Sequence, residues 1–231
     1  MKQLLENWNK FLNEGNDARI QKQIDALLAL PEDIGILIEE APGEGTSMHI
    51  VAFQYVKVLE RKPLKFHRLQ REDSTIYKDR KVIKTGIPHG GVEIWKTDAG
   101  ECLNGWAVLE SGAERGWGPL LYEVALEWAS EHGGGLTADR GIVSKYALAV
   151  WDKYAARSDI TVKQMDVDHT EKWMQKYDEL TPDIKVDDCD QGKAIDLKGD
   201  KWMDTSVSKM FSKTSTPAMD TLRSAGRLIE E

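Results

Sequence analysis

One stretch, residues 104–154, constrains the fold more than any other, because it carries local signals for strands, a tight turn and two helices. Apolar side chains recur at helical spacing after the turn, and three consecutive glycines stop the first helix. In chain order we expect a strand at 104–111, a glycine-rich turn at 115–119, a helix at 120–132, a glycine stop at 133–135, a short strand at 136–139 and a helix at 143–157. Strands and helices therefore alternate in this part of the chain.

The turn at 115–119 has the features of an anion-binding site. The first amides of a helix have no partner inside the helix, and they point outward at the positive end of the helix dipole. Gly116 and Gly118 let a ligand approach the backbone, and Arg115 adds a fixed positive charge. Pro119 suits the first helical position. The turn therefore predicts recognition of a phosphate or a pyrophosphate.

Two common phosphate-binding motifs do not fit this turn. The dinucleotide-binding fingerprint needs a further glycine where this chain has Leu121, and no strand–helix–strand repeat follows. The Walker loop needs Gly-Lys-Ser or Gly-Lys-Thr, which is not present at the turn.

The segment instead resembles motif A of the GNAT superfamily of acyl-CoA-dependent N-acetyltransferases. The run Arg115-Gly116-Trp117-Gly118-Pro119-Leu120-Leu121 matches that family's Arg-Gly-x-Gly-x-Gly-x-Leu-Leu type of turn. The family's next helix carries Asn-x-x-Ala-x-x-Leu-Tyr, and here it reads Ser144-Lys-Tyr-Ala147-Leu-Ala-Val150-Trp151. The sequence departs from the pattern at two positions: Leu120 replaces the last glycine of the turn, and Trp151 stands where many members have the Tyr that protonates the leaving thiolate.

The resemblance implies acetyl-CoA as co-substrate and a sheet that splays between the strands at 104–111 and 136–139. In the family, backbone groups of the earlier strand pair with the pantetheine arm like an added strand, and the turn holds the pyrophosphate. Ser144 matches the Asn that often contacts the pantetheine chain. Carried onto this sequence, the CoA-binding positions are Val108, Leu109, Glu110, Arg115, Gly116, Trp117, Gly118, Leu120, Ser144 and Trp151.

Acetyl transfer to an amine needs a base for the ammonium proton and a donor for the departing thiolate. By the resemblance, Glu110 lies at the splay and is the expected base, and Tyr154 is the expected donor, with Tyr146 as the alternative. Asp139 and Arg140 end the later strand beside the same cleft, where they either bind the acceptor or pair with each other. The structural alternatives are that Glu110 faces solvent and that Tyr154 packs in the core.

Composition narrows the partners and the setting. The formal net charge of −8 argues against nucleic acid, and it either suits a cationic amine acceptor, small molecule or protein, or serves solubility alone. No apolar run reaches the about 18 residues that span a bilayer, and the N-terminus has no apolar signal-peptide core. Cys102 and Cys189 are too few for a disulfide framework, so a reducing cytoplasm is the expected compartment.

No metal site is expected. Neither cysteine has a Cys or His at metal-ligand spacing, and the run Asp187-Asp188-Cys189-Asp190 lacks the glycine and terminal Glu of a calcium loop. That acidic run is expected to be part of a solvated loop.

The remaining segments flank this unit, and together they predict an α+β fold: a GNAT-like mixed, mostly antiparallel sheet flanked by helices, with N-terminal helices and a C-terminal helical tail. The expected domains are a helical segment at 1–30, an acyl-CoA-binding domain at 31–180 and a C-terminal helical extension at 181–231. The expected helices are 1–14, 17–30, 170–180, 202–213 and 217–228; the expected strands are 34–39, 48–56, 65–69, 74–77, 92–97 and 160–167; residues 183–200 are expected to be irregular.

The first helix carries a second resemblance. It looks like the leaders of proteins packaged in the heads of large tailed bacteriophages, and Leu12-Asn13-Glu14 looks like the Leu-x-Glu sites that their prohead protease cuts. The resemblance implies a phage-encoded chain, located in the host cytoplasm or packaged in the virion and associated with the phage head. The simpler alternative is that this amphipathic helix docks on the domain.

Two functions of different classes follow. The first is an acyl-CoA-dependent N-acetyltransferase in which the amine attacks the thioester directly. The second is a GNAT-like module that has lost catalysis and works by binding, for example as a phage-head protein. The turn favours the first, and the substitutions at Leu120 and Trp151 favour the second.

Overall fold

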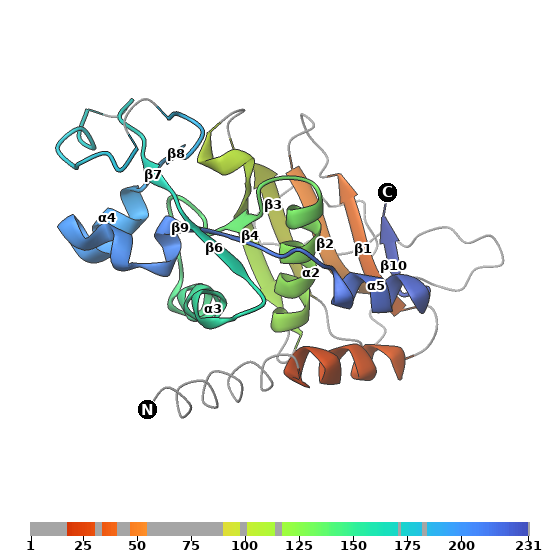
Figure 1. The fold of residues 1–231 in the computed structure, drawn as a ribbon. Helices are drawn as coiled ribbons and strands as arrows, with labels where there is room; N and C mark the ends of the chain where they lie inside the picture. Colours follow the sequence, from red (N-terminus) through yellow and green to blue (C-terminus); the bar gives the residue numbers. More distant parts are fainter. Residues whose placement is uncertain are drawn as a thin grey trace, which may run out of the picture. The chain divides into compact units, whose positions relative to one another are not determined.

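The structure is a computed structural model, and it describes residues 18–30, 34–40, 47–54, 90–97, 101–113, 117–170, 172–181 and 184–230. These residues belong to two compact units. The first unit draws them from 95–108 and 126–215, and the second draws them from 15–94, 109–125 and 216–231. Figure 1 labels the helices and strands.

The described strands form one mixed sheet and one small ribbon. The sheet has eight strands in the order β10-β1-β2-β3-β4-β5-β9-β6, and β7 pairs with β8 in a parallel ribbon (Figure 1). The pairs β1/β2, β5/β9 and β6/β9 are antiparallel, whereas β1/β10 and β4/β5 are parallel. The strands are β1 Ile34–Glu40, β2 Ser47–Gln54, β3 Gly90–Lys96, β4 Trp106–Ala113, β5 Leu136–Thr137, β6 Thr161–Gln164, β7 Asp166–Val167, β8 Asp188–Cys189, β9 Lys209–Ser212 and β10 Leu228–Glu230. The α+β class with a mixed, mostly antiparallel sheet is confirmed.

Strand β1 supplies the core of the second unit. Ile36, Leu37 and Ile38 follow one another and are all buried, so side chains on both faces of β1 are covered, and the strand pairs with β2 on one edge and β10 on the other. A strand that is covered on both faces has a continuous apolar run instead of an alternating one.

Two helices of the second unit also bury apolar side chains. Residues 18–28 are helical, as expected, and bury Ile24 and Leu27. Arg227 donates from one guanidinium nitrogen to the carbonyls of Leu28 and Leu30, at the end of that helix, where carbonyls lack partners inside a helix. Helix α5 (Pro217–Ser224) begins with the proline at its first position and buries Ala218, Met219 and Leu222.

Helix α2 (Gly118–Glu131) is buried along residues 120–129. It begins at Gly118 instead of residue 120, and it is not the one-sided amphipathic helix that we expected from the apolar stripe. Its Glu123 and Glu127 are 2% and 0% exposed. A helix that is apolar nearly all round belongs in the interior, and buried carboxylates there need partners.

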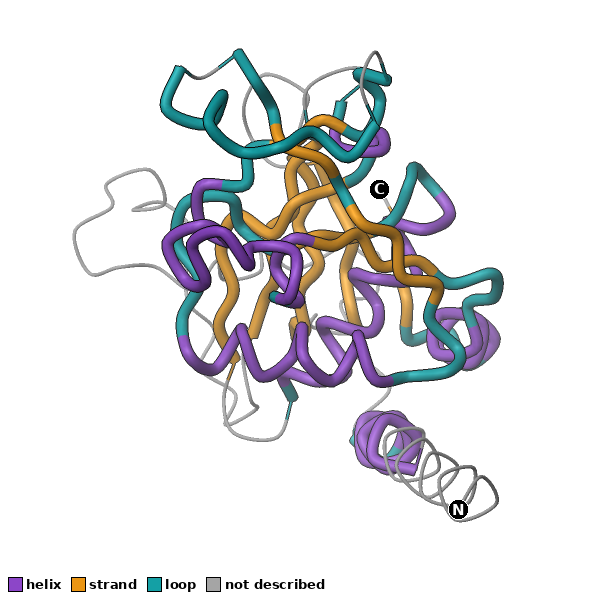
Figure 2. Tube along the Cα trace, turned by 60° about the vertical axis from the view of Figure 1, so that its left-hand side comes forward, coloured by secondary structure: helices purple, strands orange, loops and turns teal. Residues whose placement is uncertain are grey.

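The first unit has its core around β9. Helix α3 (Lys145–Ala156) brings Trp151 and Tyr154 against Phe211 of β9, with ring centroids 5.6 and 5.9 Å away. Helix α3 follows the short strand β5, as the sequence predicts. Figure 2 separates the helices from the strands by colour.

The predicted helical tail is wrong in two places. Residues 202–213 form parts of two 3₁₀ helices, η3 (Gly199–Asp204) and η4 (Ser206–Ser208), and then strand β9. Residues 217–228 are helical only to Ser224, and β10 then pairs with β1. Met210 and Phe211 are adjacent and both 0% exposed, because β9 pairs on both edges with β5 and β6. This sheet environment, instead of local propensity, decides the conformation.

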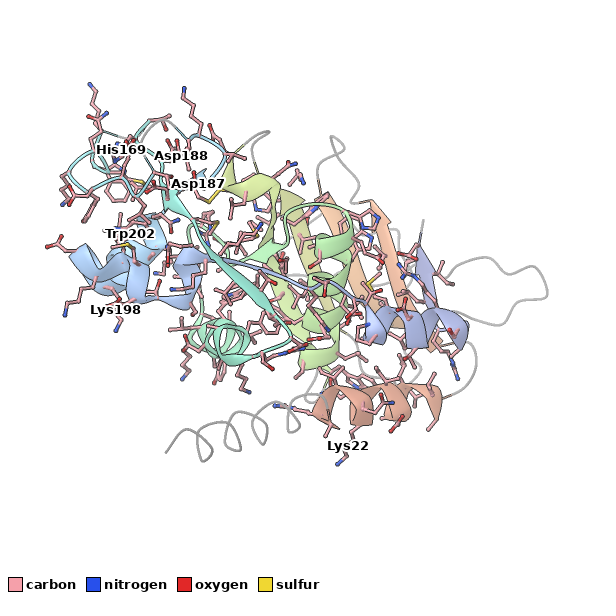
Figure 3. The ribbon with its side chains drawn as sticks, viewed as in Figure 1. Lys22, His169, Asp187, Asp188, Lys198 and Trp202 are labelled. Atoms are coloured by element: carbon pink, nitrogen blue, oxygen red, sulfur yellow. A yellow bond between two sulfur atoms is a disulfide. The ribbon has the colours of Figure 1, made fainter. Side chains whose placement is uncertain are left out.

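Three further predictions of secondary structure, all between residues 160 and 200, also need correction. The expected strand at 160–167 is broken at Met165, so that β6 joins the sheet and β7 joins the ribbon. The expected helix at 170–180 is a series of turns in its described residues, and Asp168 accepts hydrogen bonds from the amide and hydroxyl of Thr170, the expected helix cap. The expected irregular segment at 183–200 contains β8 and helix α4 (Gly192–Lys198). Figure 3 labels His169, Asp187 and Asp188 in this region.

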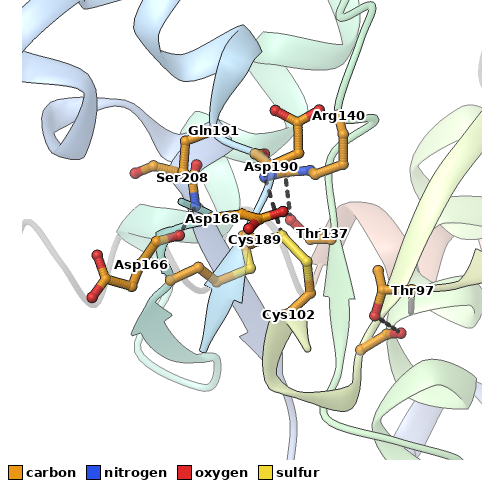
Figure 4. The surroundings of a disulfide bond; sticks show 12 residues. Thr97, Cys102, Thr137, Arg140, Asp166, Asp168, Cys189, Asp190, Gln191 and Ser208 are labelled. Carbon is orange, nitrogen blue, oxygen red and sulfur yellow. Dashed lines mark hydrogen bonds between the residues drawn. A yellow bond between two sulfur atoms is a disulfide. The ribbon is translucent and has the colours of Figure 1, made fainter. Parts of the chain in front are cut away.

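The two cysteines, expected to be too few for a disulfide framework, form one disulfide. Cys102 and Cys189 lie 87 residues apart in sequence with their Cα atoms 4.7 Å apart (Figure 4). The pairing joins the segment before β4 to β8. Such a distant pair has no spacing signature, because connectivity depends on the fold.

Some predictions fall outside the described residues. They are the helix at 1–14 with the Leu12-Asn13-Glu14 site, and the strands at 65–69 and 74–77. In the described part of the chain, no helix has both the length and the apolar character needed to cross a membrane.

Candidate functional site

Strands β4 and β5 are parallel neighbours over a very short ladder. Trp106 pairs with Leu136 and Ala107 with Thr137, and the Trp106 amide donates to the Gly135 carbonyl at 2.8 Å. Gly135 has φ of +125°, a conformation that side chains rarely adopt, so the glycine stop turns the chain into β5. In the described residues the β4/β5 ladder has only these two pairs, while β4 continues to Ala113.

The predicted CoA strand lies in β4. Val108 is 5% exposed, whereas the next two residues, Leu109 and Glu110, are exposed. Further along β4, the Ser111 hydroxyl hydrogen-bonds the Tyr122 hydroxyl of α2 at 2.7 Å. Burial raises the pKa of Tyr122 more than this hydrogen bond lowers it, so the phenol stays protonated at neutral pH. The contact fixes the start of α2 against the end of β4.

The predicted pyrophosphate turn is described only in part. Arg115 and Gly116 lie outside the described residues, whereas Trp117 and Gly118 are half-buried and Leu120 is 1% exposed. The first turn of α2 contains no acidic residue. The Leu120 side chain therefore belongs to the core, and the beginning of α2 has no carboxylate that would repel an anion.

Gly118 is not required by packing. Among the described residues, a Cβ added at this position would meet only the Ala113 Cβ, at an ordinary 3.8 Å. Gly118 also does not have a positive φ, unlike Gly135. Because Gly118 has no side chain, a ligand can approach the first amides of α2 at this position.

Asp139 and Arg140, predicted to bind the acceptor, make hydrogen bonds inside the first unit. One Asp139 carboxylate oxygen accepts from the amides of Gly141 and Ile142, at 2.6 and 2.8 Å. Arg140 donates to the carbonyls of Ala138, Asp190 and Val207 and to the Thr137 hydroxyl. Burial lowers the pKa of Arg140 to about 10, opposed by the charges of Asp190 and Asp139, so it remains a cation at neutral pH.

The predicted residues of α3 fall into two groups. Ser144 is the N-cap, and its hydroxyl accepts from the Ala147 amide at 3.2 Å. Trp151 and Tyr154 are 1% and 5% exposed and pack with Phe211. Tyr146, the alternative donor, is 76% exposed in the first turn of the helix.

The predicted residues are divided between the two units. Val108, Asp139, Arg140, Ser144, Trp151 and Tyr154 lie in the first unit, and Leu109, Glu110, Trp117, Gly118 and Leu120 lie in the second. Within the first unit the structure brings Trp151 and Tyr154 into contact, with ring centroids 5.8 Å apart. Asp139 precedes Arg140 at the end of β5, and its charge is among those that raise the Arg140 pKa.

Sequence reasoning missed a buried charge network in the first unit. Lys213, after β9, lies 2.8 Å from Glu127 and 3.6 Å from Asp159, and Arg157 donates to Asp159 through two nitrogens. Burial acts to raise the pKa of Asp159, but the Arg157 hydrogen bond and the charges of Arg157 and Lys213 outweigh it and hold that pKa below its ordinary value. The two lysine contacts span more than 50 residues, so no local sequence pattern reveals them.

The acidic run at 187–190 is more ordered than expected. Asp188 is half-buried in β8, and burial followed by repulsion from Asp166, Asp187, Glu179 and Asp168 raises its pKa. Asp166 is fully buried and accepts from the amides of Val167, Leu180 and Thr181. In the described part of the chain, no group of three His, Cys, Asp or Glu residues is placed to hold a metal ion.

Comparison of the chain with protein-family models, with curated proteins and with solved structures gives no match.

Proposed function

We propose that this protein is an acyl-CoA-dependent N-acetyltransferase that transfers an acetyl group to an amine. The observation that carries the proposal is the parallel pair β4/β5, whose ladder holds Trp106↔Leu136 and Ala107↔Thr137. Each strand leads into a helix, β4 into α2 at Gly118 and β5 into α3 behind the Ser144 cap. These are the segments whose residues resemble motif A and the helix that follows it.

Acetyl-CoA supplies the activated acetyl group as a thioester. The proposed role of the first amides of α2, with Arg115, is to bind its pyrophosphate, since an unpaired amide row at a helix start attracts anions. The proposed role of β4 backbone groups near Glu110 is to bind the pantetheine arm as an added strand. The short parallel ladder supports this role, because within the described residues β5 ends at Thr137 and pairs with β4 no further than Ala107.

The protein's own residues would move two protons. Glu110 is exposed on β4, and its carboxylate is the proposed base for the incoming ammonium. The thiolate needs a hydroxyl donor, for which Tyr154 and Tyr146 are the candidates. Tyr146 is accessible to solvent, whereas Tyr154 requires the thiol to reach the edge of the core. Tyr146→Phe and Tyr154→Phe therefore distinguish the two: loss of kcat with unchanged acetyl-CoA affinity identifies the donor.

Calorimetry with acetyl-CoA tests the proposal, and Gly118→Ala is the most informative variant. Because Gly118 is free of packing constraints, alanine leaves the unfolding free energy unchanged or slightly raised. The added methyl crowds the ligand, so we expect about tenfold weaker acetyl-CoA binding, and at least the same loss for Arg115→Ala. The proposal is contradicted if the unmodified protein does not bind acetyl-CoA, or if both variants leave the binding unchanged.

A second function, binding without transfer, is favoured by the packing of Trp151. This residue occupies the position of the family's proton-donating Tyr, yet it is 1% exposed and stacks on Phe211. Leu120, at the position of a family glycine, is also in the core. A catalytically inactive acyl-CoA-binding protein, such as a phage-head component, fits these two substitutions. Tight acetyl-CoA binding with no CoA released across a panel of amines, followed by chromatography, selects this alternative.

A further inference from the structure

The Cys102–Cys189 disulfide lies in a small apolar cluster of the first unit. Cys102 is 6% exposed and Cys189 is 1% exposed, and Met165, Met210 and the partly buried Leu103 pack around them. Both residues are buried, and Cys102 as a whole residue is slightly more exposed than Cys189. The bond ties the 3₁₀ turn η2 (Cys102–Asn104) to strand β8 (Figure 4).

The turn η2 is strained. Cys102, Leu103 and Asn104 have φ values of 48°, 54° and 58°, so three consecutive non-glycine residues adopt the left-handed conformation. In this conformation the Cβ of an L-residue lies too close to the following carbonyl oxygen, and runs of such residues are avoided. A strained segment persists only where its surroundings over-determine it.

Within the described residues, hydrogen bonds hold η2 in place together with the disulfide, among them those from the amide and hydroxyl of Thr97 to the Gly105 carbonyl. The Leu103 amide donates to the Val186 carbonyl at 2.6 Å, just before β8. The Asn104 carbonyl accepts from the Lys96 ammonium at 2.6 Å and from the Gly134 amide at 3.0 Å. The disulfide links the turn to β8, and the Leu103 bond links it to the residue two positions before β8, so reduction of the disulfide leaves that hydrogen bond between the two segments.

Arg140 is the charged group in contact with this disulfide. Its guanidinium lies 4.0 Å from the Cys189 sulfur (Figure 4). Asp188 and Asp190 flank Cys189 in the chain; one Asp190 carboxylate oxygen accepts from the Gly192 amide, and the charge of Asp190 acts to raise the Arg140 pKa. Asp166 and Asp168 are engaged by the amides of residues 167 and 180 and by Thr170. A thiolate at Cys189 would therefore have the positive charge of Arg140 in contact with it.

We propose that the Cys102–Cys189 disulfide is a reducible clasp that a dithiol opens by attack at Cys102, releasing the turn before β4. One thiolate of the dithiol bonds to the Cys102 sulfur, the disulfide breaks, and Cys189 leaves as a thiolate beside Arg140. The second thiolate of the dithiol then displaces Cys102 and closes a disulfide in the reductant. The reductant loses two electrons and the protein gains two; one of the dithiol protons ends on Cys102 and the other is released to water.

Opening the clasp has a local consequence that does not depend on the acetyltransferase proposal. Reduced Cys102 no longer holds the left-handed turn, so η2 relaxes and exposes the amides of Leu103 and Gly105 to exchange. The oxidised protein keeps them protected. Since η2 directly precedes β4, the redox state controls how firmly the start of that strand is held.

Amide hydrogen exchange of the full chain, with and without dithiothreitol, tests the clasp. We expect the Leu103 and Gly105 amides to exchange at least about tenfold faster after reduction. The Ile36 amide, which donates to the Arg227 carbonyl in the second unit, serves as an internal control and stays unchanged. The matched variant Cys102→Ser with Cys189→Ser exchanges at the faster rate in both conditions. Equal exchange of Leu103 in the oxidised and reduced proteins overturns the proposal.

The direction of attack is tested with the single-cysteine variants. Alkylation rates measured against pH give the pKa of Cys189 in Cys102→Ser and of Cys102 in Cys189→Ser. We expect Cys189 to titrate below the ordinary thiol value of about 8.5 and Cys102 to titrate at or above it. Adding Arg140→Gln leaves only the carboxylates near Cys189, so its pKa rises, whereas Arg140→Lys retains the lower value. If Arg140→Gln does not fold, the two single variants decide alone: identical titration of both thiols contradicts attack at Cys102.

Discussion

At the scale of single residues, the buried pair of Lys213 and Glu127 carries the largest electrostatic consequence. Their side chains are 3% and 0% exposed and their charged atoms lie 2.8 Å apart. An ion pair taken out of water gains little over a well-packed apolar pair, but breaking it strands a charge in the interior. The pair therefore makes stability sensitive to the loss of either partner.

Lys213→Met should lower the free energy of unfolding by about 3 kcal/mol, because the Glu127 carboxylate loses its nearest cation. Urea denaturation measures the change. The control is the double variant Glu127→Gln with Lys213→Met, which removes both charges and should recover more than half of the loss. Additive losses in the double variant would mean that the two charges are not coupled.

Asp188 should destabilise the protein at neutral pH. Its pKa is raised in the folded state, so the charged form is disfavoured there, and the folded protein gains stability as the pH falls through that pKa. Asp188→Asn should therefore raise Tm at pH 7 by about 2 °C, and the gain should vanish near pH 3, where the carboxyl is already protonated. Asp159→Asn is the control for which we expect the opposite change, a lower Tm at pH 7. Its carboxylate has a lowered pKa, so its contribution is present at pH 7 and is lost in acid.

At the scale of elements, local signals located α3 and α2 well. Helix α3 begins at Lys145, two residues after the predicted start at 143, and α2 ends at Glu131, one residue before the predicted end at 132 and just before the glycine run. The Ser144 cap itself was not predicted. The capping hydroxyl satisfies an amide that the helix cannot satisfy itself. These signals act over a few residues, so the sequence contains them completely.

The elements that the sequence did not reveal depend on distant partners. Strand β9 is four residues long, and it is a strand because β5 and β6 flank it. Strand β10 pairs with β1, about 190 residues earlier in the chain, and the disulfide joins residues separated by 87. In the candidate site, the burial of Trp151 and Leu120 could not be predicted from the motif either, because burial depends on packing against residues that are distant in sequence.

Replacement of the α3 cap separates structure from function. Ser144→Ala should cost about 1 kcal/mol of unfolding free energy through loss of the hydrogen bond to Ala147. Ser144→Asp retains a capping oxygen and should keep the stability. If Ser144 also contacts the pantetheine arm, as the resemblance implies, both variants should weaken acetyl-CoA binding in calorimetry. Restored binding in Ser144→Asp would limit Ser144 to capping.

At the scale of the whole molecule, the disulfide reduces the number of conformations open to the unfolded chain. It closes a loop between residues 102 and 189, and the chain-entropy relation gives about 4.6 kcal/mol for a loop of this length. Relaxation of η2 on reduction works in the other direction, because each left-handed residue costs about 1–2 kcal/mol. The net effect on stability is therefore smaller than the loop length alone suggests.

Reduction should lower the free energy of unfolding by about 2–4 kcal/mol in urea, measured on the oxidised protein and on the variant with Cys102→Ser and Cys189→Ser. The m-value should rise at the same time, since the unlinked unfolded chain exposes more surface. A stability loss without a change in m would place the effect of the bond in the folded state, in the turn and in β8. Equal stability with equal m would show that the cysteines are not joined in the folded protein, and this result would contradict the clasp proposal.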